Sequence, residues 1–528
     1  MNRQQNNSSE KKSIKQRLDS YFEITKRGST FRTEVIAGLT TFFAMAYIVV
    51  TNPNQIVSFN AFSGNADIDK IWYSVYVASI LVAVIGTMLM SLYAKMPFAQ
   101  ACGMGLNSFF FVSFVLPEIL NPSGDVIRGY QEGLAVILLS GILFLLISIT
   151  GARSYIAKSL PDNLKKAIPA GIGLFIALLG FKSVDMIQTN QYTLVQFFDF
   201  KGIIDAVGSN VAELKLTGAS SAVVAAYSNY FGANVTQTIT GLDAWRLIAP
   251  VVLALVGLCI MAILTKKKVS GSVIYTILGT SVIYYLATWQ LPSFSFNSIG
   301  EGFKAFGEIG IVGAFDGFGT LFSAGEGETL FAVILSAVVL VITFALVDMF
   351  DTIGTLYGAA SQGGMLDENG DPINMEKCMN SDSIATVAGA ALGTSTCTTF
   401  VESSAGVGVG GRTGFASLIT SGCFLLCLFL TPLATIIPAC ATAPALVYIG
   451  VLMLKGFANV DMTDITSAVP AFLALIMMPL TYSISNGIAI GAISHVLIRL
   501  LTGKYQKKDI IVTIIAVLFG LRFFLVTM

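Results

Sequence analysis

Charged residues and histidine are scarce in this sequence. Aspartate, glutamate, lysine and arginine together make up 12% of the 528 residues, and His495 is the single histidine. Soluble domains carry about 25% charged residues, so this composition excludes an ordinary soluble enzyme and a disordered chain. The 31 basic and 31 acidic residues cancel, which leaves no net positive charge to attract a nucleic acid.

Motifs for catalysis and metal binding are also missing. The seven cysteines include no C-x-x-C pair, which argues against a zinc site or a redox motif. The glycines at 406–411 (GVGVGG) match a dinucleotide fingerprint but lack the strand–helix context that it needs. We therefore expect neither an enzyme nor a cofactor. His495 lies in an apolar run, where it either relays protons or packs with a hydrogen-bonded partner.

Hydrophobic residues are abundant instead, at 54%, with a mean hydropathy of +0.76. They form fourteen runs that approach the length of about 20 residues needed to cross a membrane as a helix. A further run at 509–527 either spans the membrane or lies at its surface. The fourteen runs lie at 34–52, 71–93, 98–116, 131–151, 162–182, 245–265, 270–288, 330–359, 379–394, 396–411, 413–437, 438–456, 464–483 and 485–503.

The first 33 residues form a polar, basic tail without the apolar core of a signal peptide. Eight of the 31 basic residues fall within residues 1–32, so the positive-inside rule places the N-terminus in the cytoplasm of a multi-pass protein of the plasma membrane. Lys95, Arg412 and the basic loops at 153–166, 266–268 and 504–508 fall on the same side. Residues 183–244 then lie outside, and their Ser/Thr/Asn/Gly composition predicts a surface loop.

The chain repeats itself. AIPAGIGLFIALLGFKSVDM (167–186) resembles ATAPALVYIGVLMLKGFANVDM (441–462), and the apolar runs that follow also match. With seven spans in each half, the second half must insert in the opposite orientation. We therefore predict two inverted repeats, whose substrate site should lie near the midplane, where equivalent spans are broken. The repeats are 34–290 and 330–503, joined by a linker at 291–329 and followed by a C-terminal segment at 504–528.

Two of the runs are poor helices. Residues 96–111 (MPFAQACGMGLNSFFF) and 393–414 (GTSTCTTFVESSAGVGVGGRTG) are rich in glycine and small polar residues. Glycine weakens helices, and unwound backbone is tolerated in a membrane only where protein or a cavity satisfies it. These segments are either the broken spans of a site or places where helices pack closely through small residues.

Three carboxylates are predicted inside the spans: Asp348, Asp351 and Glu402. Such a group costs several kcal/mol in a membrane unless it is paired, protonated or facing a cavity, and these spans contain no lysine or arginine partner. Burial disfavours the charged form, which suits a group that takes up and releases a proton. Asp348 and Asp351 share a helix face. The alternative is that a carboxylate caps the end of a broken helix.

Five ordered motifs then give the sequence a family resemblance. They are RTEVIAGLTTFFAMAYIVVTNP (32–53), CGMGLNSFF (102–110), DMFDTIGTLYG (348–358), GTSTCTTFVESSAGVGVGGRTG (393–414) and MPLTYSISNGIAIG (478–491). Together they resemble the nucleobase:cation symporter-2 superfamily, and within it the AzgA-like branch of hypoxanthine, guanine and adenine permeases. Two positions depart from that branch: Ala101-Cys102 replaces the usual Ala-Pro, and GVGG at 408–411 lacks the usual acidic residue.

The resemblance implies an all-α polytopic membrane protein with fourteen transmembrane segments in two inverted repeats of seven. It implies a core domain of residues 34–151 plus 330–437 and a gate domain of residues 161–288 plus 438–503. It also implies that spans 3 and 10 each contain a short strand followed by a half-helix.

By motif, the resemblance carries substrate contacts over to Asp351, Glu402, Asn107 and Gly105. Carboxylates accept hydrogen bonds from purine N–H groups, and half-helix N-termini donate to ring nitrogens or a carbonyl. Candidates for stacking on the base are Phe400, Phe109 and Tyr47. Thr352 and Thr355 either assist Asp351 or bond to their own helix, and Thr355 is also a candidate for substrate contact. The proton-coupling residues are expected among Glu402, Asp351 and Asp348.

We therefore expect a proton-coupled symporter that imports purine bases (guanine, hypoxanthine and by extension adenine) by alternating access, surrounded by lipid and without a nucleic-acid partner. Sodium as the driving ion and a homodimer stay open. The alternatives are a xanthine or uracil carrier, an anion transporter on the same fold, and a membrane receptor that uses the 183–244 loop.

Overall fold

The computed structural model describes residues 14–525 with short gaps. The first 13 residues of the predicted tail at 1–33 and most of the basic loop at 153–166 lie outside the described residues, and the rest of the tail contains helix α1 (Ile14–Phe22). The gaps are 58–64, 122–123, 151–160, 191–193, 217–220, 232–236, 268, 270, 293–295, 324–328, 369–370, 401 and 435.

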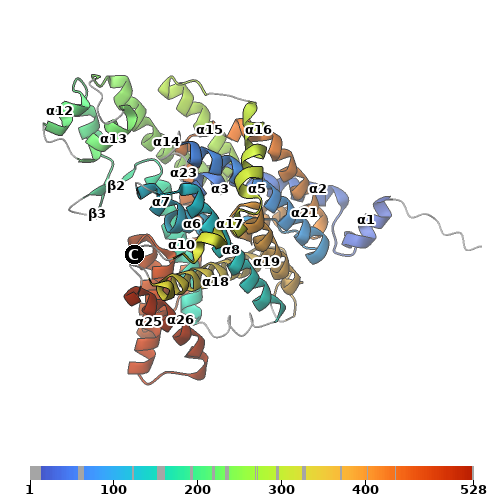
Figure 1. Ribbon diagram of the computed structural model, residues 1–528. Helices are drawn as coiled ribbons and strands as arrows, with labels where there is room; N and C mark the ends of the chain where they lie inside the picture. Colours follow the sequence, from blue (N-terminus) through green and yellow to red (C-terminus); the bar gives the residue numbers. More distant parts are fainter. Residues whose placement is uncertain are drawn as a thin grey trace, which may run out of the picture.

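Helices make up the membrane part of the chain (Figure 1). In the first half they are α2 (Phe31–Met45), α3 (Ile48–Val57), α5 (Ala66–Leu89), α6 (Met104–Phe110), α7 (Leu116–Leu120), α8 (Val126–Ile149), α10 (Asp162–Lys182), α14 (Gly241–Lys266) and α15 (Ser272–Thr288). In the second half they are α18 (Leu330–Gln362), α19 (Met375–Leu392), α20 (Ser403–Gly408), α21 (Gly414–Leu426), α22 (Thr431–Ala434), α23 (Ala439–Leu454), α24 (Ile465–Leu480), α25 (Ile484–Leu501) and α26 (Ile510–Leu525).

Each of the fourteen predicted runs overlaps one or more of these helices. Within the described residues, nine helices are long and apolar enough to cross a membrane, and four shorter apolar helices accompany them. The all-α membrane fold is therefore confirmed. The number of spans and the inverted repeats stay predictions.

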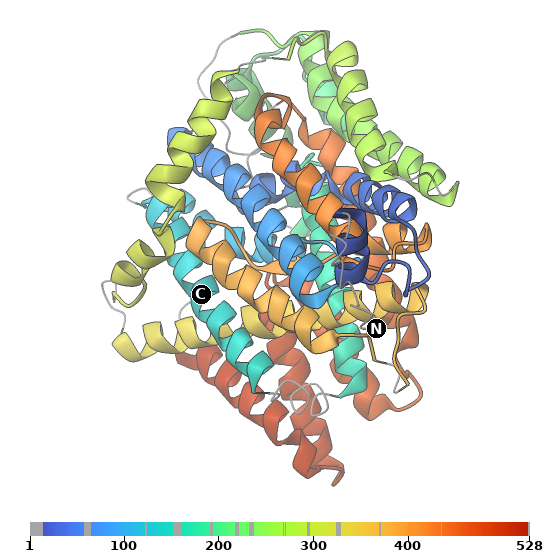
Figure 2. The same ribbon diagram turned by 90° about the vertical axis from the view of Figure 1, so that its right-hand side faces the viewer.

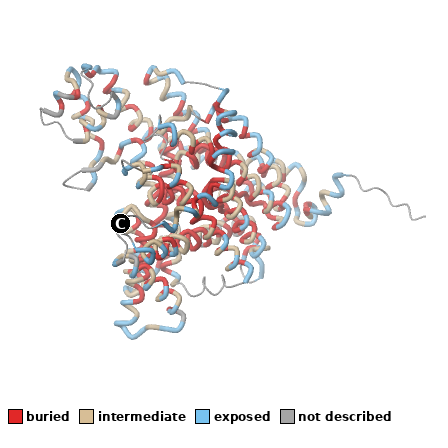
Figure 3. Tube along the Cα trace, in the orientation of Figure 1, coloured by how far each residue is buried: buried red, intermediate tan, exposed pale blue. Residues whose placement is uncertain are grey.

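Buried residues gather in the middle of the bundle (Figure 3). Many large apolar side chains are exposed nonetheless. Leu286 and Leu501, for example, are 71% and 86% exposed. An apolar exterior fits a chain whose outer solvent is lipid. The interior, in contrast, holds many buried polar side chains, including Gln100, Asn107 and Asp382.

The helices pack in two sets. Helix α10 lies against α23 and α24, α24 lies against α25, and α14 lies against α15 and α23. In the other set, α2 packs on α20 and α21, and α19 packs on α5 and α8. Helices α10 and α23 cross at two glycines, since a Cβ on Gly173 would lie 2.8 Å from the Gly450 carbonyl oxygen. The predicted core and gate domains are not tested by these contacts and stay predictions.

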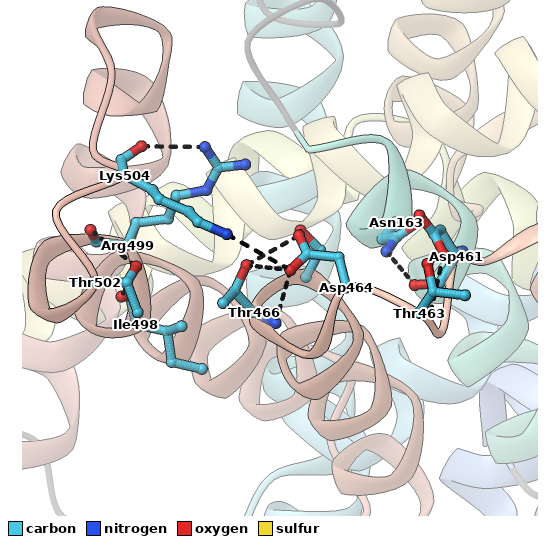
Figure 4. Close-up of polar contacts among 10 residues, drawn as sticks. Asn163, Asp461, Thr463, Asp464, Thr466, Ile498, Arg499, Thr502 and Lys504 are labelled. Atoms are coloured by element: carbon cyan, nitrogen blue, oxygen red, sulfur yellow. Dashed lines mark hydrogen bonds and ion pairs between the residues drawn. The ribbon is translucent and has the colours of Figure 1, made fainter.

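Hydrogen bonds fix one end of the α10–α23–α24 set (Figure 4). Asn163, near the start of α10, donates to the Asp461 carbonyl oxygen at 2.9 Å and accepts from the Asp461 backbone N–H at 3.0 Å. Asp464 caps α24 through the Thr466 N–H. Hydrogen bonds from the Thr466 and Ser467 hydroxyls lower the pKa of Asp464, and the Lys504 ammonium lies 4.0 Å away.

The predicted surface loop at 183–244 is folded, which corrects that prediction. It forms a hairpin of β2 (Ile187–Asn190) and β3 (Leu194–Phe197) and the helices α11 (Phe200–Asp205), α12 (Val211–Leu216) and α13 (Ser221–Phe231). Ile203, Val211 and Tyr227 form an apolar cluster with residues of α14, beside which the insertion projects at the upper left of Figure 1. The abundant small polar residues had masked these few apolar positions.

The linker and the C-terminal segment are helical as well. Residues 291–329 contain α16 (Asn297–Ala305) and α17 (Gly313–Leu321), which pack on α5 and α8 respectively. Helix α26 lies beside α25 (Figure 2). His495 of α25 and Asp509 are both buried, with Nε2 and Oδ1 3.3 Å apart. This is the packed, hydrogen-bonded arrangement among the two alternatives for His495.

Candidate functional site: a strand crossing with buried carboxylates

Two short strands meet in the middle of the bundle. Strand β1 (Gln100–Cys102) pairs antiparallel with β4 (Cys397–Thr399), and Ala101 lies opposite Thr398. Helix α6 follows β1 and helix α20 follows β4, so both helices begin at the crossing. The strand followed by a half-helix, predicted for spans 3 and 10, is confirmed. Helix N-termini carry partial positive charge and unpaired N–H groups, which makes the crossing a place for polar groups of a ligand.

Threonines from neighbouring helices complete the hydrogen bonds of the two strands. The Thr87 hydroxyl of α5 lies 3.0 Å from both the N–H and the carbonyl oxygen of Gln100. On the other strand, the Thr386 hydroxyl of α19 makes the same two contacts with Cys397, also at 3.0 Å. Because lipid cannot satisfy backbone groups, these two threonines allow an isolated pair of strands to exist at this depth.

Glu402 stands directly before α20, and its carboxylate is held by a tyrosine from the turn between α2 and α3. Although Glu402 occupies the N-cap position of α20, its side chain makes no capping hydrogen bond. Its Oε1 instead accepts a hydrogen bond from the Tyr47 hydroxyl at 2.7 Å. The structure thus brings together two of the predicted site residues, Glu402 and Tyr47, and places the carboxylate outside a capping role.

Asp348 and Asp351 lie on α18, which runs without interruption from Leu330 to Gln362. A continuous helix has no internal end, so the alternative that these residues cap a broken helix is wrong. Asp351 lies within electrostatic reach of Glu402. Asp348 is 1% exposed and contacts the Thr386 hydroxyl at 2.9 Å. Thr355 donates to the Asp351 carbonyl oxygen at 3.0 Å and thus bonds to its own helix.

A fourth buried carboxylate, Asp382 of α19, was missed in the sequence. It accepts a hydrogen bond from Gln100 Nε2 of β1 at 3.0 Å and another from the Thr352 hydroxyl of α18. The Thr352 hydroxyl also lies 2.8 Å from the Thr398 hydroxyl of β4, so it is committed to the strands rather than to Asp351. The signal was available, because Asp382 falls inside the predicted run 379–394. Among the described residues, no ion pair joins any of these four carboxylates to a lysine or arginine.

The predicted residues of the first half-helix are enclosed by polar and close contacts. Asn107 donates to Asn52 and, at 3.3 Å, to Gln55 Oε1, both on α3, and accepts from the Ser395 hydroxyl. A Cβ on Gly105 would clash with the Ile172 side chain, so α6 touches α10 at this glycine. The predicted aromatic candidates Phe109 and Phe400 are 2% and 7% exposed, and the Phe109 ring packs on Phe344. The roles of all these residues in binding stay predictions.

Helix α20 is held in place by its neighbours, which the sequence also did not reveal. Glu34 of α2 is fully buried and accepts hydrogen bonds from the N–H groups of Arg412, Thr413 and Ala416. The Arg412 guanidinium donates to the Val407 carbonyl oxygen at 2.7 Å. Since both ends of the GGRTG turn are tied down, the half-helix that carries Glu402 is a fixed element.

Comparison with known proteins identifies the kind of protein that holds this site. Residues 32–215 and 232–490 match the sequence pattern of a protein family that is described as a permease family. The chain belongs to this permease family. The predicted membership in the nucleobase:cation symporter-2 superfamily is thereby confirmed, and the protein is a multi-pass membrane transporter rather than an enzyme.

Relatives of this permease align over almost its whole length. Adenine permease AdeP of Escherichia coli strain K12 is 34% identical, covering 96% of this chain and 95% of its own. Guanine/hypoxanthine permease PbuO of Bacillus subtilis strain 168 is 33% identical, covering 96% of this chain and 100% of its own. Among solved structures, the transmembrane domain of the cyanobacterial bicarbonate transporter BicA matches with a TM-score of 0.50 at 15% identity, covering 92% of this chain and 97% of that chain. This last likeness concerns the fold alone.

Proposed function

We propose that this permease imports purine bases together with protons by alternating access, in the plasma membrane and with its N-terminus in the cytoplasm. The observation that carries the proposal is the half-buried Glu402 carboxylate, which stands directly before the half-helix α20 and accepts from the Tyr47 hydroxyl, with Asp351 of the continuous helix α18 within electrostatic reach. The adenine and guanine/hypoxanthine permeases that align with the whole chain support purines as the cargo.

The chemistry of a purine suits this arrangement. Its ring N–H groups donate to carboxylate oxygens, and its ring nitrogens or carbonyl accept from backbone N–H groups at a helix N-terminus. One proton on the carboxylate pair removes the repulsion between two buried charges, so proton binding and base binding favour each other. Release of that proton on the cytoplasmic side restores the repulsion and weakens the hold on the base.

The energetics are sufficient for uptake. Moving one charge through the membrane potential yields about 2.3 kcal/mol per 100 mV. Since about 1.4 kcal/mol corresponds to a factor of ten, one proton per neutral base supports roughly a fifty-fold concentration difference, before any pH gradient contributes.

The test is uptake of labelled hypoxanthine into cells that lack their own purine carriers. Unlabelled guanine, adenine, xanthine and uracil serve as competitors, with and without a protonophore. We expect uptake to be blocked by guanine and abolished by the protonophore. Accumulation that follows a sodium gradient instead would overturn the proton coupling. Absence of hypoxanthine, guanine and adenine uptake, with the protein verified in the membrane, would overturn the proposed cargo and direct tests to xanthine, uracil and small anions.

A further inference from the structure

A cavity lies apart from the carboxylates of the strand crossing, at the end of the bundle where the insertion at 183–244 begins. It has a volume of about 250 Å³ and separates α3 and α6 from α10 and α23. Thr51 of α3 lines it and lies one turn beyond Tyr47, which directly precedes α3, since the Thr51 N–H donates to the Tyr47 carbonyl oxygen at 3.0 Å. Gln55 lies one further turn along, about 12 Å from Tyr47 at 1.5 Å per residue. The cavity is therefore distinct from the Glu402 site but lies beside the same helix.

Gln55 supplies an uncommitted donor to this cavity. The side chain is 8% exposed and lines the cavity wall. Its Oε1 accepts a hydrogen bond from Asn107 Nδ2 at 3.3 Å, while its buried Nε2 has no hydrogen-bond partner among the described residues. Buried polar groups are nearly always paired, and an unpaired one costs about 1–3 kcal/mol. A ligand that accepts a hydrogen bond from Nε2 would recover that cost.

The remaining walls favour a flat, neutral ligand. Phe111 and Tyr482 contribute aromatic rings, and the Lys182 ammonium lies 4.8 Å from the centre of the Tyr482 ring. Among the described residues that line the cavity, Lys182 is the one cation and Asp185 is the one anion. The two charges balance, so the cavity does not favour a charged solute. The volume falls just below the range of about 300–1,000 Å³ for drug-sized ligands, which suits a two-ring base.

We propose that this cavity is an outer binding site for a neutral purine-class heterocycle, in which Gln55 Nε2 donates to a ring nitrogen or carbonyl and aromatic side chains cover the ring. The inference rests on the proposed function. It also gives Asn107 a positioning role, because its amide holds the Gln55 carbonyl and thereby directs the –NH₂ group. The permease then binds two bases per chain, one at Glu402 and one at Gln55.

Equilibrium binding of labelled hypoxanthine to the purified full-length permease tests this inference. We expect the wild type to bind two bases and Glu402→Ala to retain one. In the Glu402→Ala background, Gln55→Glu keeps the acceptor for Asn107 but removes the donor, and it should weaken the remaining binding at least tenfold. Tyr482→Leu, which removes an aromatic wall, should weaken it severalfold, so the inference does not depend on one variant.

Asn54→Asp in the same background is the matched control. Asn54 is the neighbour of Gln55 and lines the same cavity, and its Oδ1 accepts from Trp72 Nε1 at 2.6 Å, a bond that aspartate retains. The control adds the same charge to the cavity while leaving the Gln55 amide intact, so it should weaken binding clearly less than Gln55→Glu does. Thermal unfolding of each variant confirms that it is folded.

The outcomes separate the inference from the proposed function. If the wild type binds no purine, the proposed function fails. If the wild type binds one base and Glu402→Ala binds none, the permease has a single site and the outer site is overturned. If Glu402→Ala retains one base but Gln55→Glu and Asn54→Asp affect it equally, the retained site lies elsewhere and the inference is again overturned.

Discussion

The two half-helices that start at the strand crossing differ in length and in how their polar residues are used. After β1, α6 continues through a π-helical turn at Phe111–Val115 into α7 and ends at Leu120. After β4, α20 ends at Gly408 and the chain turns at Gly410, whose φ is +108°. Asn107 on α6 is fully buried in amide and hydroxyl contacts. Glu402, before α20, is half-buried and held by Tyr47.

This difference indicates a division of labour between two segments that look alike in sequence. The first half-helix is locked into α3 and the strand region, which suits a scaffold. The second presents a carboxylate that accepts one hydrogen bond, from the neutral Tyr47 hydroxyl, and such a group can change its protonation without dismantling a network. Similar glycine-rich patterns therefore do not imply equal roles in binding.

The largest effect is expected from Glu402→Gln. The amide keeps an oxygen that accepts from Tyr47, so the fold should persist, but the group can no longer take up a proton. We expect proton-driven accumulation at a membrane potential of about 100 mV to fall about fifty-fold, a loss of about 2.3 kcal/mol, while exchange of base without net accumulation continues. The measurement compares accumulation with counterflow in the same vesicles. Unchanged accumulation would show that the two half-helices do not differ as inferred.

Asp382→Ala tests the scaffold on the other side of the strands. The change leaves Gln100 Nε2 and the Thr352 hydroxyl without their acceptor, and an unsatisfied buried donor costs about 1–3 kcal/mol. We expect the purified protein to unfold at a lower temperature, by several degrees. Glu368→Ala, at an exposed position, is the control and should unfold like the wild type. An equal response of the two variants would contradict a structural role for Asp382.

The sequence was informative where a pattern is local. Glycine and small polar residues inside an apolar run located both broken spans, and the strands were found at residues 100–102 and 397–399. A lone acidic residue in such a run is equally visible, and Asp382 falls inside the predicted run 379–394. Local patterns of this kind were sufficient to predict a helical membrane protein.

Contacts between distant segments could not be predicted from the sequence. Gln100 and Asp382 lie 282 residues apart, and Tyr47 and Glu402 lie 355 residues apart. Nothing in the spacing of either pair reports that they meet, because the helix packing that joins them depends on the whole bundle. The burial of Asn107 in an amide network has the same origin, since its partners come from α3 and from Ser395.

Tyr47→Phe tests the same comparison of the two half-helices, with a smaller expected effect. The variant removes the hydroxyl that donates to Glu402 but keeps the ring, and a hydrogen bond to a carboxylate contributes about 1.5–3 kcal/mol. Part of this is recovered by water or by the base itself, so we expect the half-saturating hypoxanthine concentration to rise about three- to tenfold. Tyr448→Phe on α23 serves as a control for loss of a tyrosine hydroxyl. A larger effect from Tyr448→Phe would place the functional hydroxyl elsewhere.

The smallest effect is expected from Thr355→Val, although the sequence made Thr355 a candidate for substrate contact. Its hydroxyl donates to the carbonyl oxygens of Asp351 and Thr352, at 3.0 and 3.1 Å. Valine matches the shape of threonine, and a hydroxyl that bonds back to its own helix contributes little to helix stability. Uptake kinetics should change less than twofold. A tenfold rise in the half-saturating concentration would mean that the hydroxyl leaves its helix to meet the base, and α18 would then join α20 as a segment whose polar groups exchange partners during transport.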